Sequence, residues 1–182
     1  MKYSERYKVC LKNPSPAEMD LRDPLSTFSF YLSGRVNVLC GFADEIIENL
    51  DEGFLASSVD GGRISRAESL MWLWILGAYE IVRTMVQAEK CFSPEALKKL
   101  RVLKKSLSVV RMPASKMEKQ GKRVPVTSNR SPAGWNVENK DLLVNDPEGD
   151  DISARELFSN FDKTFCSIRK SDILARHEDT YK

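Results

Sequence analysis

Residues 65–88 read SRAESLMWLWILGAYEIVRTMVQA, and their apolar side chains surround the helical axis almost completely. A helix without a polar face belongs in the middle of a fold, where other elements cover it on several sides. We therefore expect this segment to be the central helix. Most of the surface of Trp72, Trp74 and Tyr79 is then expected to be buried.

The segment before it shows helical periodicity over residues 24–52, with apolar side chains every three or four positions. Gly34 and Gly41 lie inside this segment and are places where it could break. Gly53 is a plausible helix end, and the sequence Asp-Gly-Gly at 60–62 predicts a turn. Ser-x-x-Glu patterns, typical of helix starts, begin at three serines: Ser15, Ser65 and Ser153.

A third helix is predicted after Ser93, with a leucine stripe on its buried side. It is expected to stop or kink near Met112, because Pro113 has no amide to donate and restricts the residue before it. A last helix is predicted over residues 154–169. The region between these two helices contains short segments with strand character at 124–126, 135–137 and 142–144, the latter two as a hairpin.

The chain has 182 residues, which is the size of one ordinary domain. The predicted fold is an all-α bundle of four to five helices with a small irregular or β-hairpin insertion. We expect one domain over residues 1–182, with the insertion at about 120–151 and a C-terminal tail at about 170–182. The longest apolar stretch, residues 70–78, is about half of a membrane span. The sequence thus predicts a cytoplasmic protein without membrane contact.

Charge is strongly segregated along the chain, although the formal net charge is only +2. Residues 98–130 contain eleven Lys or Arg and a single acidic residue, Glu118, whereas both flanking regions are acidic. Lys98, Arg101 and Lys105 fall on one side of the third helix, opposite its leucines. The candidate polyanion-binding residues are Lys98, Arg101, Lys104, Lys105, Arg111, Lys116, Lys119, Lys122, Arg123 and Arg130.

A basic helix face continued by a basic loop is typical of proteins that bind a phosphate backbone. RNA is the first partner to consider, with DNA or another polyanion next. Lys and Arg on an outer helix face can also serve solubility alone, pair with the acidic flanks of the same chain, or bind an acidic protein. A structural dimer or assembly subunit is a further alternative, so the sequence favours a non-catalytic interaction role.

The residues that could support chemistry are few. The four cysteines, Cys10, Cys40, Cys91 and Cys166, are widely spaced and are expected to be reduced core residues. No metal site or cofactor is predicted, because clustered Cys and His are absent from the sequence. The acidic run at 146–151 is interpreted as a solvated turn before a helix. His177 is the only histidine, and its simplest interpretation is an exposed residue in the tail.

The helical outline, the central segment at residues 77–84, and an arginine and a histidine near the last helix resemble the HEPN superfamily. Its members are small helical bundles, often dimeric, found in toxin and defence systems, and many cleave RNA. The family pattern is Arg, four to six residues, then His, whereas seven residues separate Arg169 from His177 here. The resemblance implies a metal-independent ribonuclease as the alternative function, with Arg169 and His177 as its catalytic residues.

Overall fold

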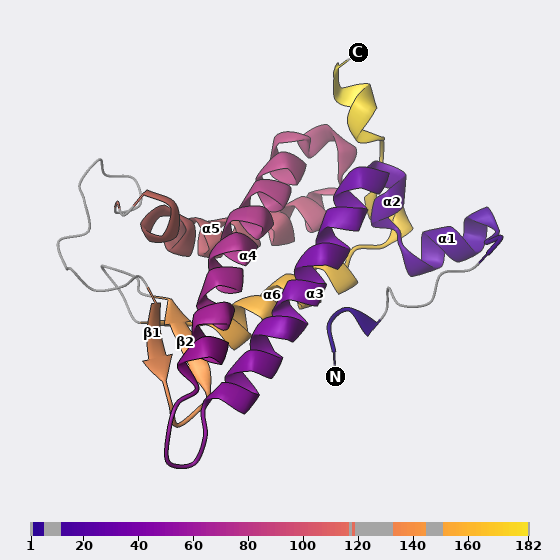
Figure 1. Ribbon diagram of the computed structural model, residues 1–182. Helices are drawn as coiled ribbons and strands as arrows, with labels where there is room; N and C mark the ends of the chain where they lie inside the picture. Colours follow the sequence, from indigo (N-terminus) through magenta and orange to yellow (C-terminus); the bar gives the residue numbers. More distant parts are fainter. Residues whose placement is uncertain (1, 6–11, 117, 119–132, 145–150, 182) are drawn as a thin grey trace.

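The computed structural model describes residues 2–5, 12–116, 118, 133–144 and 151–181 of the chain. Long helices dominate, and a small antiparallel sheet lies at one end (Figure 1). The helices are α1 (Pro16–Arg22), α2 (Leu25–Phe28), α3 (Phe30–Gly53), α4 (Gly61–Gln87), α5 (Pro94–Lys116) and α6 (Ala154–Cys166). The strands are β1 (Ala133–Asn136), β2 (Asp141–Val144) and β3 (Ile152–Ser153), in the order β1–β2–β3.

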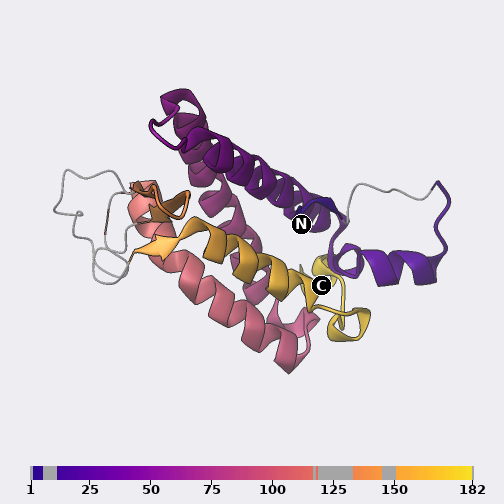
Figure 2. The ribbon, with the colours of Figure 1, turned by 90° about the horizontal axis from the view of Figure 1, so that it is seen from below.

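Helix α4 occupies the centre of the arrangement. It pairs with α3 on one side and with α5 on another, while α6 packs against α3, α5 and β2 (Figures 1 and 2). The short helix α1 lies outside this body, next to α2 (Figure 1). The fold is therefore mostly helical, as predicted, but it includes a three-stranded sheet and is not an all-α bundle.

The predicted hairpin is confirmed, and a third strand that the sequence did not reveal pairs with it. Strands β1 and β2 are antiparallel, with Trp135 opposite Leu142. The turn between them includes Lys140, whose φ of 49° lies in the left-handed region. Strand β3 pairs with β2 and leads directly into α6. The predicted strand at 124–126 lies outside the described residues.

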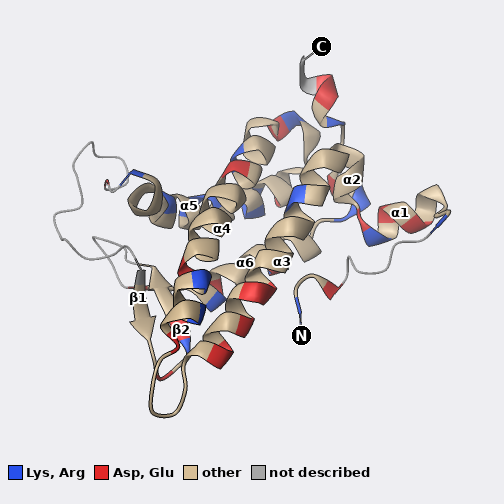
Figure 3. Ribbon diagram, in the orientation of Figure 1, with Lys and Arg blue, Asp and Glu red and all other residues tan. Residues whose placement is uncertain are grey.

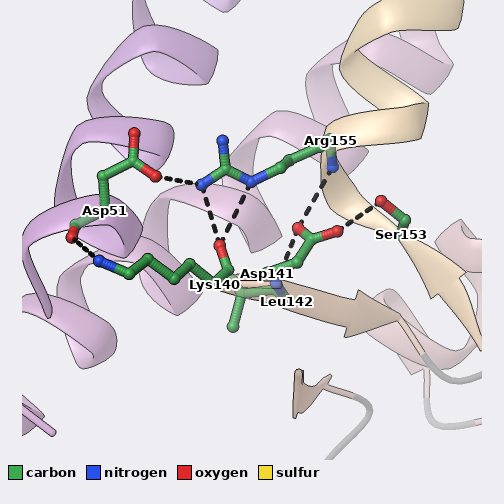
Figure 4. A network of polar contacts seen from close by, with 6 residues as sticks. All are labelled: Asp51, Lys140, Asp141, Leu142, Ser153 and Arg155. Carbon is green, nitrogen blue, oxygen red and sulfur yellow. Dashed lines mark hydrogen bonds and ion pairs between the residues drawn. The ribbon is translucent and has the colours of Figure 1, made fainter. Parts of the chain in front are cut away.

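A polar network attaches the sheet to the helices (Figure 4). The carboxylate of Asp141, only 5% exposed, accepts hydrogen bonds from the Ser153 hydroxyl and from the backbone amides of Leu142 and Arg155. The guanidinium of Arg155 donates to the Lys140 carbonyl at 2.9 Å and to Asp51 of α3 at 2.6 Å. This network fixes β2 and the start of α6 against the end of α3.

The first predicted long helix is interrupted at one position, and its predicted end is kept. The helical segment breaks at Ser29, and not at Gly34 or Gly41, because the backbone of Ser29 is extended and its hydroxyl accepts from the Leu32 amide. The predicted end at Gly53 is confirmed.

The start of α4 also differs from its prediction. The helix begins at the Asp60 cap, whose carboxylate accepts from the amides of Gly62 and Arg63, so residues 60–62 form a helix start and not a separate turn. Ser65 lies inside the helix. The predicted caps at Ser15 and Ser153 are confirmed, since both hydroxyls accept from the amide three residues later.

Helix α5 continues past its predicted end near Met112 and finishes at Lys116. Pro113 lies inside the helix with its ring buried, so tertiary packing outweighs the missing amide. Helix α6 ends at Cys166 and not at residue 169, and Ser167 caps it.

The largest enclosed side chain, Trp74 of α4, marks the middle of the hydrophobic core. Its ring is 0% exposed, and Phe158 and Phe161 of α6 lie edge-on to it at centroid distances of 4.7 and 5.3 Å. Aromatic pairs favour this geometry. Helix α6 therefore covers the inner side of α4 through direct side-chain contacts.

Trp72 contradicts the prediction that α4 is buried all round. Its side chain is 50% exposed, and its indole Nε1 donates to the carbonyl oxygen of Ala114 at 2.9 Å. Leu73 beside it is also exposed, because α3, α5 and α6 leave strips of the α4 surface uncovered. No helix among the described residues is both long and apolar enough to span a lipid bilayer.

The different environments of the two tryptophans give a stability prediction. Trp74→Ala should lower the free energy of unfolding by about 3–5 kcal/mol, because it opens a cavity between α4 and α6. Trp72→Ala should cost clearly less, since its ring already contacts water. Chemical denaturation of both variants measures the difference, and equal losses would contradict the assigned orientation of α4.

Candidate nucleic-acid interface

The buried side of α5 is the leucine stripe that the sequence predicts, and the opposite side carries the basic residues. Leu100, Leu103 and Leu107 are buried, whereas Lys98 and Lys105 are exposed. Within the part of the chain that the structure describes, neither Lys98 nor Lys105 forms an ion pair. Both ammonium groups are therefore open to an external anion.

Arg101 lies on the same exposed side of α5, between these two lysines. Its guanidinium meets Glu89 at 2.9 Å, and both side chains are more than half exposed. Surface ion pairs of this kind contribute little to stability and are weakened by salt. Arg101 can therefore exchange Glu89 for a phosphate at small cost. We call Lys98, Arg101 and Lys105 the basic face of α5.

Two further candidates lie at the edge of α5 that faces α4. Lys104 is half-buried there. Arg111 lies over the ring of Tyr79 at 5.1 Å and 3.8 Å from the carboxylate of Glu80, which Arg83 binds more closely at 2.8 Å. Arg111 is thus held in place by α4 with only a distant acidic partner.

The remaining candidates lie at or beyond the end of α5. Lys116 is its last residue and is exposed. The structure does not describe the other four: Lys119, Lys122, Arg123 and Arg130. Most of the acidic run, residues 146–150, also lies outside the described residues.

Among the described residues, pairing with the acidic flanks involves one member of the basic face, Arg101, which pairs with Glu89. The acidic residues gather in the C-terminal half of α3, at the bottom of the view in Figure 3. They pair with basic residues outside α5, in the pairs Lys2–Glu48, Arg63–Glu52, Arg66–Glu45 and Arg155–Asp51. The charge segregation seen in the sequence is therefore kept in the fold.

The two residues of the ribonuclease hypothesis lie in different surroundings. Arg169 is exposed and lines a cleft of about 790 Å³ between α1 and the end of α6. His177 is half-buried, with its ring 5.1 Å from that of Phe28, and it does not line that cleft. The joint catalytic role of the two side chains stays a hypothesis.

Cysteine burial follows the prediction only in part. Cys40 and Cys91 are buried, and burial raises the pKa of Cys91. Cys166 is exposed at the end of α6, which corrects the expectation of a core residue, and Cys10 is not described. The described residues contain no group of His, Cys, Asp and Glu that could hold a metal ion.

Sequence reasoning considered Trp135 as a base-stacking residue, with the core as the usual place of aromatic side chains, but it did not place Trp72 on this surface. Trp72 of α4 and Trp135 of β1 are both about half exposed, close to where α5 ends. The apolar composition of α4 concealed Trp72, because only the packing of α5 and α6 shows which side of the helix remains open.

Comparisons of the chain with protein families, with characterised proteins and with solved structures give no match. The likeness to the HEPN superfamily therefore stays a hypothesis.

The segment that carries Arg169 and His177 is attached to the start of α5 through Asp172. Its carboxylate accepts from the Arg169 amide and the Ser93 hydroxyl, and these bonds lower the pKa of Asp172 below its ordinary value of 3.8. A carboxyl group with a lowered folded pKa stabilises the fold above its unfolded pKa. That stabilisation is lost as the pH falls through the folded value.

We therefore expect a loss of stability that involves Asp172 as the pH falls below about 4, the ordinary pKa of an Asp carboxyl. Asp172→Asn should destabilise the protein at neutral pH and flatten its stability profile in that range. Thermal unfolding across pH values measures both effects. Glu178→Gln is the control, because Glu178 is exposed and its ion pair with Arg176 is also exposed. Equal profiles for the Asn variant and the wild type would contradict the role of Asp172.

Proposed function

We propose that this chain binds a polyanion through the basic face of α5, with RNA as the first ligand. The observation that carries the proposal is that Lys98 and Lys105 are exposed and have no acidic partner among the described residues. Arg101 lies between them and pairs with the exposed Glu89. The three residues span seven positions, about 10 Å along the helix axis. Such a row can contact successive phosphates of one strand.

Release of counterions from the phosphate backbone supplies the binding free energy in this arrangement. The contacts made by the basic face read charge and spacing but not base identity. Binding is thus expected to depend steeply on salt and weakly on base sequence. The +10 formal charge of residues 98–130, set by eleven basic residues and Glu118, adds a long-range attraction for the same ligand.

The change of Lys98, Arg101 and Lys105 together to alanine should weaken RNA binding strongly. Each lost phosphate contact should lower the slope of log affinity against log salt by about 0.7 to 0.9. Fluorescence anisotropy with a labelled RNA at several salt concentrations measures this slope. Folding should be unaffected, because none of the three side chains lies on the buried stripe.

The matched control changes Lys12, Arg66 and Lys163 to alanine. It removes the same charge from scattered exposed positions, and Arg66 has an ion pair at 2.9 Å that resembles that of Arg101. Equal weakening by both triple variants would show that only net charge matters. A wild-type protein that binds neither RNA nor DNA at low salt would leave an acidic protein as the partner. Recovery of shortened RNA from the same samples would support the ribonuclease hypothesis.

A second candidate function, a structural dimer, is favoured by an apolar groove between α3 and α4. The groove has a volume of about 520 Å³, and its sides include the exposed Tyr31, Val38 and Leu73. At its floor Gly77 permits close approach, because a Cβ atom there would lie 3.0 Å from Leu39. Exposed apolar surface of this kind is typical of interfaces.

The charge distribution along α3 fits a second copy of the chain in this groove. Arg35 lies near the start of α3, and the acidic residues lie in its C-terminal half. In a two-fold antiparallel contact, Arg35 of each copy would face the acidic half of the other. Such a contact is isologous and closes with two copies.

Leu73→Glu should abolish dimer formation, because it places a charge on the apolar side of this groove. Leu174→Glu is the control, since Leu174 is exposed elsewhere at 62%. Analytical ultracentrifugation of the wild type and both variants measures the mass. A wild-type monomer at high concentration would remove this candidate function and leave the RNA proposal unaffected.

A further inference from the structure

Two tryptophan side chains are held by hydrogen bonds while about half of each remains exposed to solvent. Trp72 is 50% exposed and Trp135 is 49% exposed. The indole Nε1 of Trp72 donates to the Ala114 carbonyl at 2.9 Å, and that of Trp135 donates to the Glu68 carboxylate at 2.8 Å. One hydrogen bond at the ring edge fixes each indole and leaves its π surface available.

The two rings are neighbours on the surface. Glu68, which binds the Trp135 indole, lies four residues before Trp72 on α4. Residues four apart lie on the same side of a helix, about 6 Å apart along its axis. Trp135 itself comes from β1, which Phe54 supports through an edge-on ring contact at 6.2 Å. The sheet therefore holds the Trp135 indole at Glu68, one helical turn before Trp72 on α4.

A shallow hollow adjoins the Trp72 ring. It has a volume of about 460 Å³ and is lined by Glu68, Ser69, Trp72 and Leu73. This volume lies in the range of small-molecule sites and is large enough for a nucleobase. The Glu68 carboxylate and the Ser69 hydroxyl provide polar atoms at its edge, and Trp72 and Leu73 provide flat apolar contact.

A series of contacts between α4 and α5 leads from this hollow to the basic residues Arg111 and Arg101 of α5. In order along α4, Trp72 contacts Ala114, Tyr79 contacts Arg111, and Glu89 just after α4 contacts Arg101. The partners run in the opposite order along α5, so the helices are antiparallel here. Ala114 lies three residues after Arg111, which is about 5 Å along the axis. Trp72 thus contacts α5 about one helical turn beyond Arg111.

We propose that Trp72 and Trp135 form a stacking platform for unpaired bases of single-stranded RNA, whose backbone follows the basic face of α5. The proposal rests on the proposed RNA-binding function and adds the strand state of the ligand. Aromatic rings beside a row of cations bind single strands, because every unpaired base has a π face. A duplex keeps its bases stacked on each other and offers the rings no partner.

The test compares two ligands that differ only in their bases. One is a fluorescein-labelled twelve-residue oligouridine, and the other is a base-free phosphodiester oligomer of the same length and charge. Wild-type protein should bind the oligouridine more tightly. Trp72→Ala and Trp135→Ala should each weaken binding of the oligouridine by about 5- to 100-fold and leave binding of the base-free oligomer unchanged.

Two further variants separate stacking from folding and from general aromatic exposure. Trp72→Phe keeps a flat ring but loses the N–H bond to Ala114, so it should retain most of the oligouridine affinity. Phe30→Ala removes a remote aromatic side chain of α3, 76% exposed, and should change nothing. Thermal unfolding of each variant confirms that its fold is kept.

Several outcomes would overturn the proposal. Equal wild-type affinity for the two oligomers, or equal losses for both in the alanine variants, would show that the tryptophans do not contact bases while the phosphate-binding function stands. A Trp72→Phe variant as weak as Trp72→Ala would likewise exclude stacking. If the wild type binds neither oligomer, the proposed RNA-binding function itself is wrong, and an acidic protein becomes the partner.

Discussion

The indole of Trp74 is enclosed between α4 and α6, and this contact determines how the other elements can be arranged. Phe158 and Phe161 cover the ring edge-on, and its Nε1 has no hydrogen-bond partner among the described residues. Leaving a buried polar atom unpaired costs free energy, so the surrounding packing must offset it. Once this side of α4 is covered by α6, the places left for α3 and α5 are the two flanks. Helices α3 and α5 on these two flanks do not cover all of α4, so Trp72 and Leu73 remain at the surface.

The sequence indicates the composition of α4 but not its orientation. Apolar side chains all round predict a central helix, which is correct, yet Trp72 and Trp74 are equally apolar and differ completely in exposure. This difference in exposure depends on how α5 (residues 94–116) and α6 (residues 154–166) pack against α4. Hydrophobic periodicity is a local pattern and does not predict such long-range contacts. The exposed basic face of α5 was predictable, because a leucine stripe on one side of a helix leaves the other side to solvent.

Local signals failed where a stronger interaction overrode them. Pro113 does not end α5, since its ring packs into the core, and Ser65 does not begin α4, since Asp60 already supplies the cap one turn earlier. Strand β3 has only two residues and is recognised only by its pairing with β2. In the candidate interface, helical geometry located Lys98, Arg101 and Lys105. The restraint of Arg111 by Tyr79 and Glu80 required the tertiary contact between α4 and α5.

The attachment of residues 172–174 to residues 91–93 has a consequence for the order of folding. The Ser93 amide donates to the Asp172 carbonyl, the Leu174 amide donates to the Cys91 carbonyl, and Phe92 pairs with Ile173. These bonds join parts of the chain about 80 residues apart, so closing them is slow compared with forming the helices. On the ribosome, α5 would remain without this support until residue 174 has left the exit tunnel. The basic face of α5 would then be fully synthesised, and able to bind anions, before the helix reaches its final position.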